Sequence, residues 1–317
     1  MSGQTAAGKQ GTRLPRSRRS PTPPQFLLTP RDIRILRHVY SMRFLTQDQI
    51  GRLEFSPSSV SSCKRRLTLL YHGGYLDRVF VPVGAVCGFG RGAYCLDSKG
   101  AALLAREDGL TLADLDWRQD DNDRDSVFLD HLLDTNDVQL AMIASTRRRR
   151  WGLRWTNERT LRRDLAKEKI GDPLDPGRLL SLIPDGYARI EAAGEAHAFA
   201  VELDRGTVEE KRIRQKIRAY GEWNASGAHR RRYGVDSLRV LFVVSGRPSR
   251  PARARRLREW CEAEGGRSLF WFMEHDHLAA ADILSDPIWE VAGRPGRHAL
   301  IETRPPPPRP RSLPALR

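Results

Sequence analysis

Long hydrophobic runs are missing from this sequence of 317 residues. No apolar stretch approaches the roughly 18 residues that a membrane-spanning helix needs, and the first residues lack the apolar core of a signal peptide. Cysteine is scarce and never forms a CxxC pair; it occurs at Cys63, Cys87, Cys95 and Cys261. So few cysteines cannot make a disulfide scaffold, so we expect reduced thiols. Together with the missing apolar runs, this predicts a soluble cytoplasmic protein with no membrane contact.

Two catalytic signatures are also missing. The sequence has no GxxxxGK[ST] phosphate-binding loop, which argues against a reaction driven by ATP. It also has no cluster of histidines beside a nucleophilic tyrosine, which argues against a self-contained relaxase.

Acidic residues are in the minority. Against 54 lysines and arginines stand 39 acids, so the formal net charge is +15 and the pI is about 10.3. This balance favours a polyanionic partner, and double-stranded DNA fits it best. An anionic membrane surface is the alternative, but no amphipathic helix of the required kind supports it.

Shifts in composition divide the chain into five segments. A basic arm rich in glycine, serine and proline covers 1–27, and a proline- and arginine-rich tail covers 292–317; we expect both to be disordered. Between them we predict a first domain over 28–109, an acidic linker over 110–125, and a second domain over 126–291.

The first domain contains the start and stop signals of short helices, followed by those of a hairpin. Three helices are predicted over 30–40, 47–55 and 58–72, and two strands over 75–83 and 92–97. This order is typical of a winged helix-turn-helix domain, whose third helix enters the DNA major groove. The alternative is a winged helix that binds protein.

The third helix and the wing supply the predicted DNA contacts. Short hydroxyl donors stand at its start and positive charge follows them, while Val60, Leu67 and Leu70 are expected to face the core. The candidate DNA-binding residues are Ser58, Ser59, Ser61, Ser62, Lys64, Arg65 and Arg66 of the helix, with Arg78 and Arg91 of the wing.

Strands alternate with helices in the second domain after an initial hairpin. The apolar runs are short and are separated by amphipathic segments, as in 238–245 and 268–273. We therefore expect a mixed α/β sheet covered by helices on both faces.

The hairpin places carboxylates at its open end. With a tight turn at Ala193-Gly194, the pairing puts Asp185 directly opposite Glu202, so their Cβ atoms would be about 4.5–5.5 Å apart. Asp204 follows on the same face. Two carboxylates so close repel each other, so either one is protonated or a cation bridges them, and Mg²⁺ fits the bridging position well. The alternative is a set of solvated acids at strand ends.

These residues resemble the PD-(D/E)xK nuclease pattern, in Pro184-Asp185 and then Glu202-Leu203-Asp204. The resemblance implies that Asp185 and Glu202 bind Mg²⁺ and that a lysine orients the attacking water. Asp204 stands where the pattern has that lysine and would assist the metal ligands. Lys216 on the next helix is the candidate replacement.

Two further features bear on a metal site. Glu158, at the start of the helix after the Trp151–Trp155 strand, could add another acid, although a helix-dipole role explains it equally well. His275 and His277 form an HxH pair that could ligate a metal, but a solvated surface segment is the favoured interpretation.

The whole arrangement resembles the replication-relaxation family of plasmids and mobile elements. The matching segments, in order, are LTPRDIRIL, FLTQDQI, LTLLYHGGYLDR, IPDG, AVELDRGT and KIRAY, over about 28–290. The resemblance implies a DNA-binding protein acting in plasmid replication or mobilisation, together with replication or relaxosome proteins. Mg²⁺-dependent nicking and a non-catalytic regulator with a degenerate nuclease fold both remain open.

Overall fold

The chain forms two compact units, Met1–Leu133 and Asp134–Arg317. The computed structural model describes residues 14–15, 18–80, 92–123, 126–165, 169–172, 174–245 and 251–302. The boundary between the units falls inside helix α5 (Ser126–Arg149). The stretch predicted as a linker therefore belongs to the first unit, where Leu115 is buried and Asn122 donates to the Leu96 carbonyl.

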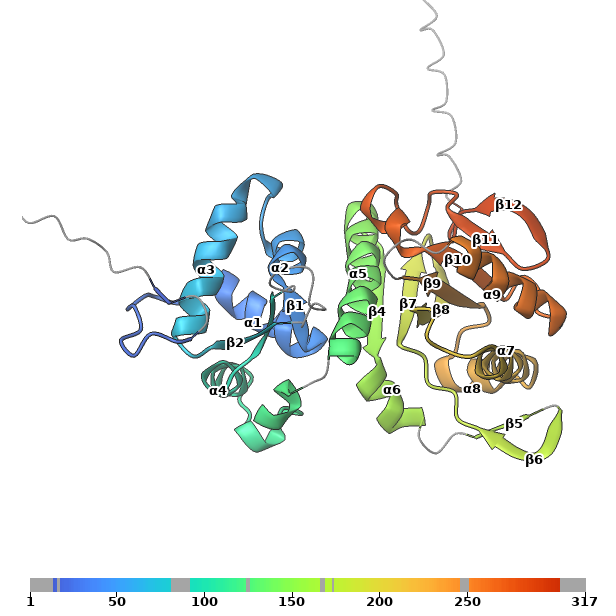
Figure 1. Cartoon of the computed structure of the whole chain (residues 1–317), viewed down its shortest axis with the longest axis horizontal. Coiled ribbons are helices and arrows are strands. Elements are labelled where there is room, and N and C mark those ends of the chain that lie inside the picture. The colour runs from blue at the N-terminus through green and yellow to red at the C-terminus, as the bar shows by residue number, and fades with distance from the viewer. Residues whose placement is uncertain are drawn as a thin grey trace, which may run out of the picture. The chain divides into compact units, whose positions relative to one another are not determined.

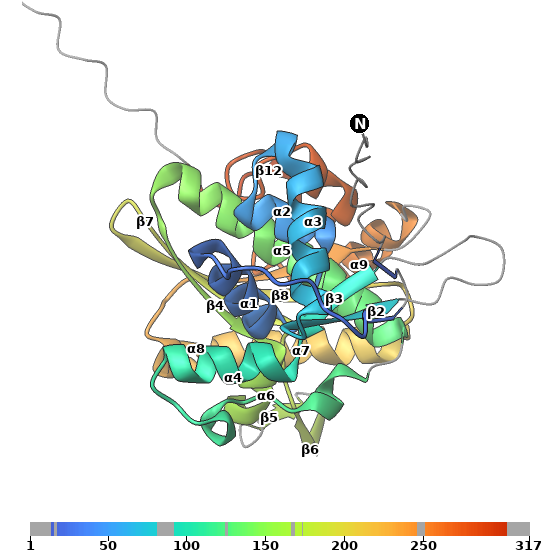
Figure 2. The same ribbon diagram turned by 90° about the vertical axis from the view of Figure 1, so that its left-hand side faces the viewer.

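Three helices open the first unit, as predicted: α1 (Pro30–Met42), α2 (Gln47–Glu54) and α3 (Val60–His72). Reciprocal side-chain caps at Thr29 and Thr46 start the first two. A 3-10 turn (Pro57–Ser59) precedes α3. Figure 2 shows α2 and α3 side by side, as their contacts require.

A small antiparallel sheet and a fourth helix complete this unit. Its strands are β1 (Phe44–Thr46), β2 (Leu76–Phe80) and β3 (Gly92–Leu96), in the order β1-β3-β2, followed by helix α4 (Ser98–Glu107). Helix, helix, helix, hairpin is thus the order of the structure. The predicted end of the first hairpin strand, its turn and Arg91 lie outside the described residues.

Two expectations for the first unit are wrong in part. Val60 keeps 61% exposure instead of facing the core: it is the first residue of α3, which begins two residues later than predicted, and the apolar side of the helix runs through Leu67 and Leu70. The described end of the basic arm is not disordered either. Arg19 donates to the carbonyls of Tyr71 and Leu76 and pairs with an acid of β2, so this segment packs on the unit.

The second unit is built on a mixed sheet, as predicted. The sheet has seven strands, in the order β12-β11-β10-β9-β8-β7-β4. Strands β8, β9 and β10 run parallel and the other pairs are antiparallel. The strands are β4 (Gly152–Asn157), β7 (Gly186–Ala192), β8 (Glu195–Asp204), β9 (Leu238–Val244), β10 (Phe270–Glu274), β11 (Trp289–Val291) and β12 (Arg294–His298). A separate pair joins β5 (Ile170–Asp172) and β6 (Asp175–Leu180).

Helices cover both faces of this sheet (Figure 1). On one face lie α7 (Glu210–Ala225), α8 (Ala228–Tyr233) and α9 (Pro251–Ala263); on the other lies the later part of α5. Helix α6 (Glu158–Leu165) follows β4. Phe242 packs on the α7 side and Leu241 and Val243 on the α5 side, so β9 is apolar throughout.

The sheet extends further along the chain than predicted. Residues 292–302 were expected in the disordered tail, yet they form β12 and a segment in which Leu300 and Ile301 are buried in the core. Gly293 adopts φ of 70°, which lets the chain reverse directly after β11. The second domain therefore includes this segment.

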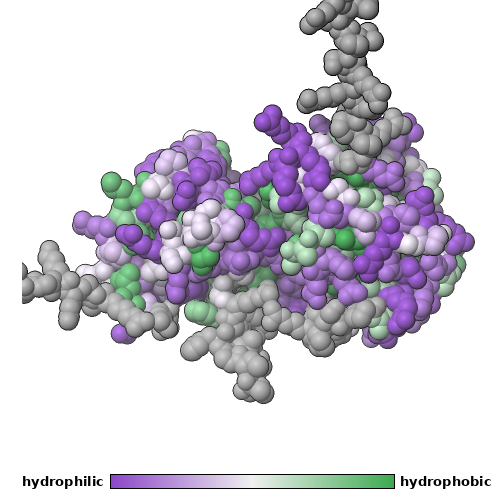
Figure 3. All heavy atoms as spheres, turned by 90° about the horizontal axis from the view of Figure 1, so that it is seen from above, coloured by the Kyte–Doolittle hydropathy of each residue, from purple (hydrophilic) through white to green (hydrophobic). Residues whose placement is uncertain are grey.

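The surface is largely polar where Figure 3 shows it, with apolar side chains in small patches. Among the residues that the structure describes, no helix is both long and apolar enough to cross a membrane.

Candidate functional site

The β7–β8 hairpin has the predicted register. Ala192 pairs with Glu195 and Gly186 with Val201, while Ala193 and Gly194 take positive φ angles of 52° and 87° in the turn. Two consecutive positive φ angles are those of a type I′ turn, which suits the twist of a two-residue hairpin. The register therefore brings the open end of the hairpin together as the sequence implied.

Asp185 sits immediately before β7 and is bound to the neighbouring strand. Its amide donates to the Val201 carbonyl at 3.0 Å, and its Oδ2 accepts from the Leu203 amide at 2.7 Å. Gly186 is required beside it, because a Cβ there would lie 2.2 Å from Cζ2 of Trp155. The carboxylate is thus held across the end of β8.

Glu202 accepts hydrogen bonds from two side chains of α7. Lys216 Nζ lies 2.5 Å from Glu202 Oε2, and the Tyr220 hydroxyl donates to Oε1 at 2.5 Å. Lys216 and Tyr220 are four residues apart, so they share one face of the helix. The Glu202 side chain is 4% exposed, whereas that of Lys216 keeps 35% exposure.

Burial and neighbouring charge set the protonation of this cluster. Burial raises the pKa of Glu202 to about 7; Lys216 opposes that rise and Asp185 adds to it. Burial by itself would lower the pKa of Lys216, but the negative charges of Glu202 and Asp185 outweigh it and raise that pKa. Glu158 contributes to the same rise, so it lies within electrostatic reach of the lysine.

Asp204 is engaged elsewhere, contrary to the expectation that it assists the metal ligands. Arg253 of α9 donates to both of its oxygens, at 2.6 Å from Nε and 3.2 Å from Nη2. Both side chains are buried, so Arg253 neutralises the acid that replaces the lysine of the nuclease pattern. Its geometry is that of a buried ion pair.

Sequence reasoning missed two residues of this region. The spacing of Tyr220 from Ile213 and Ile217 is that of the apolar face of the helix; its position four residues after Lys216 was the signal that could have found it. Nothing in the sequence indicated that Arg253 pairs with Asp204, because it is one of several arginines in a basic helix and lies 49 residues from Asp204.

The predicted DNA-binding residues of the first unit divide into two groups. Ser58, Ser61, Ser62, Lys64 and Arg65 are exposed, and Ser59 is half-buried. Two arginines are instead held by their own domain.

Arg66 pairs with buried Asp32 and donates to the Leu27 carbonyl. Arg78 lies over the rings of Tyr71 and Phe80 at 4.5 and 5.1 Å from their centroids. Arg91 cannot be placed because it lies outside the described residues.

A concave surface accompanies the exposed side of α3. It has a volume of about 540 Å³, and its lining includes Ser62, Arg31, Arg34, Arg65 and Arg66. Arg34 is paired with Glu54 and Arg31 lies over the Phe55 ring, while Arg65 is exposed. The arginines of this concave surface therefore come from the first turns of α1 and from α3.

The model of the family described as replication-relaxation matches residues 36–238. The chain belongs to the replication-relaxation family. Among curated proteins no match was found. The restriction endonuclease FokI is 11% identical to the chain, with a TM-score of 0.23 over 78% of the chain and 42% of FokI, so the chain spans under half of that structure.

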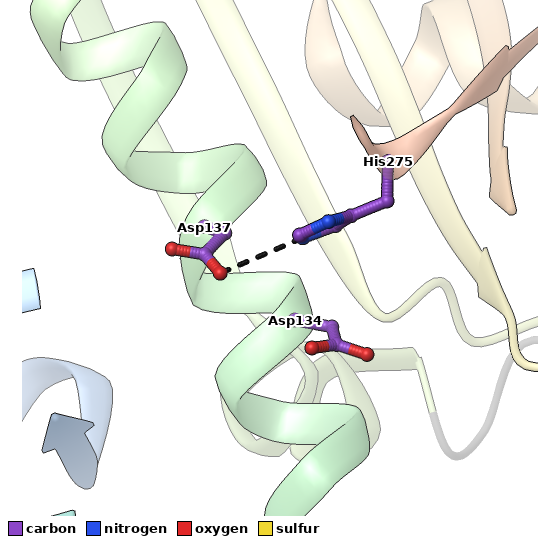
Figure 4. Close-up of side chains that lie close together, drawn as sticks. All are labelled: Asp134, Asp137 and His275. Atoms are coloured by element: carbon purple, nitrogen blue, oxygen red, sulfur yellow. Dashed lines mark ion pairs between the residues drawn. The ribbon is translucent and has the colours of Figure 1, made fainter. Parts of the chain in front are cut away.

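A second group of polar side chains in this replication-relaxation protein fits a divalent metal. Asp134 and Asp137 of α5 and His275 after β10 offer ligand atoms within 4.8 Å of one another (Figure 4). His275 belongs to the HxH pair that was expected to be a solvated surface segment. Its partners come from a helix that the sequence did not connect with it.

The Glu202 cluster can hold a hard cation by its donor chemistry. The carboxylates of Asp185 and Glu202 are oxygen donors, and an ionised carboxylate accepts at about four sites. Mg²⁺ commonly takes one or two protein carboxylates and completes its shell with water and phosphate oxygens. These residues fit that requirement.

Proposed function

We propose that this replication-relaxation protein binds double-stranded DNA through α3 and nicks it with Mg²⁺ at Asp185, Glu202 and Lys216. It would act in plasmid replication or in DNA relaxation during mobilisation, in the cytoplasm. The observation that carries the nicking proposal is the 2.5 Å contact between Lys216 Nζ and Glu202 Oε2. This contact places a lysine beside the two carboxylates, although Asp204 occupies the lysine position of the nuclease pattern.

Each side chain has a role that its position supports. Asp185 and Glu202 hold the cation, which when bound supplies a water of lowered pKa and offsets charge on the scissile phosphate. Lys216 keeps its charge, because its pKa is raised, and its partial exposure lets the ammonium group contact the attacking oxygen or the phosphate. Tyr220 orients Glu202 from the buried side.

The DNA-binding part of the proposal is supported by the exposed side of α3. Three exposed serines, Lys64 and Arg65 project from it and its preceding turn, next to the basic concave surface. Hydroxyl and cationic donors of this kind bind phosphate oxygens and fix the register of a helix on the duplex. Arg66 and Arg78 support the fold in this proposal, since each is held within it.

The nicking proposal is tested on supercoiled plasmid carrying the replicon's own origin, with Mg²⁺ or with EDTA. We expect the full-length wild type to open the plasmid only with the metal, and D185A, E202A and K216A each to reduce the rate by at least about 100-fold, or about 2.7 kcal/mol. K211A is the matched control, because Lys211 is an exposed lysine on the same helix. Equal rates for wild type and K216A would contradict the assignment.

A second candidate function is a non-catalytic DNA-binding regulator or relaxosome accessory protein. The observation that favours it is the closed environment of Glu202, which is 3% exposed and accepts from both Lys216 and Tyr220. In that case the cluster only stabilises the hairpin. No cleavage with any divalent metal, together with intact DNA binding, would select this function.

DNA binding is tested separately through its dependence on salt. A phosphate contact contributes about 0.9 to the slope of log K against log salt on duplex DNA. We expect K64A and R65A each to lower the slope by roughly that amount, measured by fluorescence anisotropy on origin DNA. R106A, at an exposed arginine of α4, should leave it unchanged. A slope near zero for the wild type would contradict binding through phosphates.

A further inference from the structure

The geometry points to a second metal site, formed by Asp134, Asp137 and His275, that takes a divalent transition metal of the Zn²⁺ type. It goes beyond the proposed nicking site. Asp137 and Asp134 lie on α5, which covers one face of the sheet, whereas Glu202 contacts α7 on the other face. Figure 4 shows all three side chains directed into one space between α5 and the end of β10.

The position of His275 is the observation that decides in favour of a ligand. Its Nε2 is buried and has no hydrogen-bond partner among the described residues, which is costly for a polar atom. Its nearest carboxylate oxygen is Asp137 Oδ2, with which it forms the ion pair drawn in Figure 4 at 3.5 Å, longer than a good N–H···O bond. Two donors bonded to one tetrahedral ion at about 2.1 Å are themselves about 3.4 Å apart. The observed spacing suits a shared cation.

The carboxylate of Asp134 is oriented by its surroundings. Ser245, directly after β9, donates to Oδ2 at 2.8 Å, and Arg205 Nε approaches the same oxygen at 3.9 Å. Such outer contacts hold ligating carboxylates in place at metal sites. Asp276 adds further negative charge next to His275.

The donor set selects the class of metal. One imidazole nitrogen with two carboxylates suits zinc and its neighbours, whereas Mg²⁺ prefers oxygen donors alone. Three protein ligands leave a coordination position for water. Bound there, the ion would join α5 to the end of β10, two elements whose ligands are far apart in the chain.

Calorimetric titration of the full-length protein, freed of metal with EDTA, tests this site with ZnCl₂ as the probe. We expect one Zn²⁺ per chain in the wild type. D137N and H275N should each bind at least about tenfold more weakly, since loss of a supporting contact alone weakens metal sites by roughly 10–100-fold. H277N is the matched control, because His277 lies in the same 3-10 segment (His275–Ala279).

A second control separates this site from the nicking site: E202Q should keep full Zn²⁺ affinity even if it abolishes nicking. Should the variants not fold, as judged by circular dichroism in EDTA, Co²⁺ absorption of the wild type reports the ligands without mutation. Four-coordinate Co²⁺ bands that excess Mg²⁺ does not remove would support the site. No Zn²⁺ binding by the wild type, displacement by Mg²⁺, or unchanged affinity in both D137N and H275N would overturn it.

Discussion

At the scale of single residues, position 204 distinguishes this chain from the nuclease pattern that it resembles. Asp204 is buried and would carry an uncompensated charge without Arg253, which donates to both of its oxygens. Arg253 also donates to the Val208 carbonyl and stacks on Trp260, so its guanidinium is fixed on several sides. The pair therefore serves the fold, and Lys216 is left as the lysine of the proposed nicking site.

Removing Arg253 is expected to destabilise the protein strongly. R253M leaves Asp204 buried and unpaired, a change that typically costs about 3–5 kcal/mol. Urea unfolding of wild type and variant measures it. D236N is the control, because the Arg230–Asp236 pair is 73% and 77% exposed and such pairs contribute about 1 kcal/mol or less. A loss below about 1 kcal/mol in R253M would show that Asp204 does not need this partner.

At the scale of elements, the short helix α8 closes one side of the core beside the hairpin. Its His229 is 2% exposed, and its Nε2 lies 2.8 Å from the Tyr187 hydroxyl of β7. The rings of Trp223 and Tyr233 enclose it, at centroid distances of 4.9 and 5.5 Å. Burial lowers the pKa of His229 to about 4, so the fold holds this ring neutral.

This neutral histidine predicts a loss of stability in mild acid. In the unfolded chain histidine takes up a proton near pH 6.5, but in the folded chain only near pH 4, so acidification between those values favours unfolding. The full effect is roughly 3 kcal/mol at 1.36 kcal/mol per pKa unit.

The measurement compares unfolding free energies at several pH values in H229Q and in the wild type. The glutamine does not titrate, so the variant should lose less stability between pH 6.5 and 4. H298Q, at a partly exposed histidine, serves as the control. Equal pH dependence in H229Q and the wild type would exclude His229 as the cause.

At the scale of the whole molecule, the second unit needs more of the chain than its composition suggested. Strand β12 pairs with β11 at the sheet edge, and Ile301 donates its amide to the Leu284 carbonyl. Leu300 and Ile301 are 1% and 6% exposed. Because the surrounding residues are rich in proline and arginine, composition alone predicted disorder for this short part of the core.

Truncation tests this extension. A chain ending at Val291 loses β12 and both buried aliphatic side chains, whose burial contributes about 1.5–3 kcal/mol each. We expect its free energy of unfolding to fall by roughly 3–6 kcal/mol relative to a chain ending at Glu302, measured by urea denaturation. Equal stability of the two chains would show that 292–302 lies outside the folded core.

The local arrangement was predictable from the sequence because short-range rules govern it. Caps at Thr29 and Thr46 depend on residues three positions apart, and the hairpin register follows from a turn that needs positive φ at Gly194. Strand periodicity then places Asp185 opposite Glu202 without knowledge of anything else. These features involve contacts between neighbours in the chain or across one turn.

Tertiary structure alone decided what surrounds those acids. Asp204 and Glu202 share one face of β8, yet one meets Arg253 of α9 and the other Lys216 of α7, according to how each helix packs on the sheet. Asp137 and His275 come together only when α5 packs on its face of the sheet. Partners so far apart in the chain are chosen by packing of the whole core, because no local preference of the backbone links them.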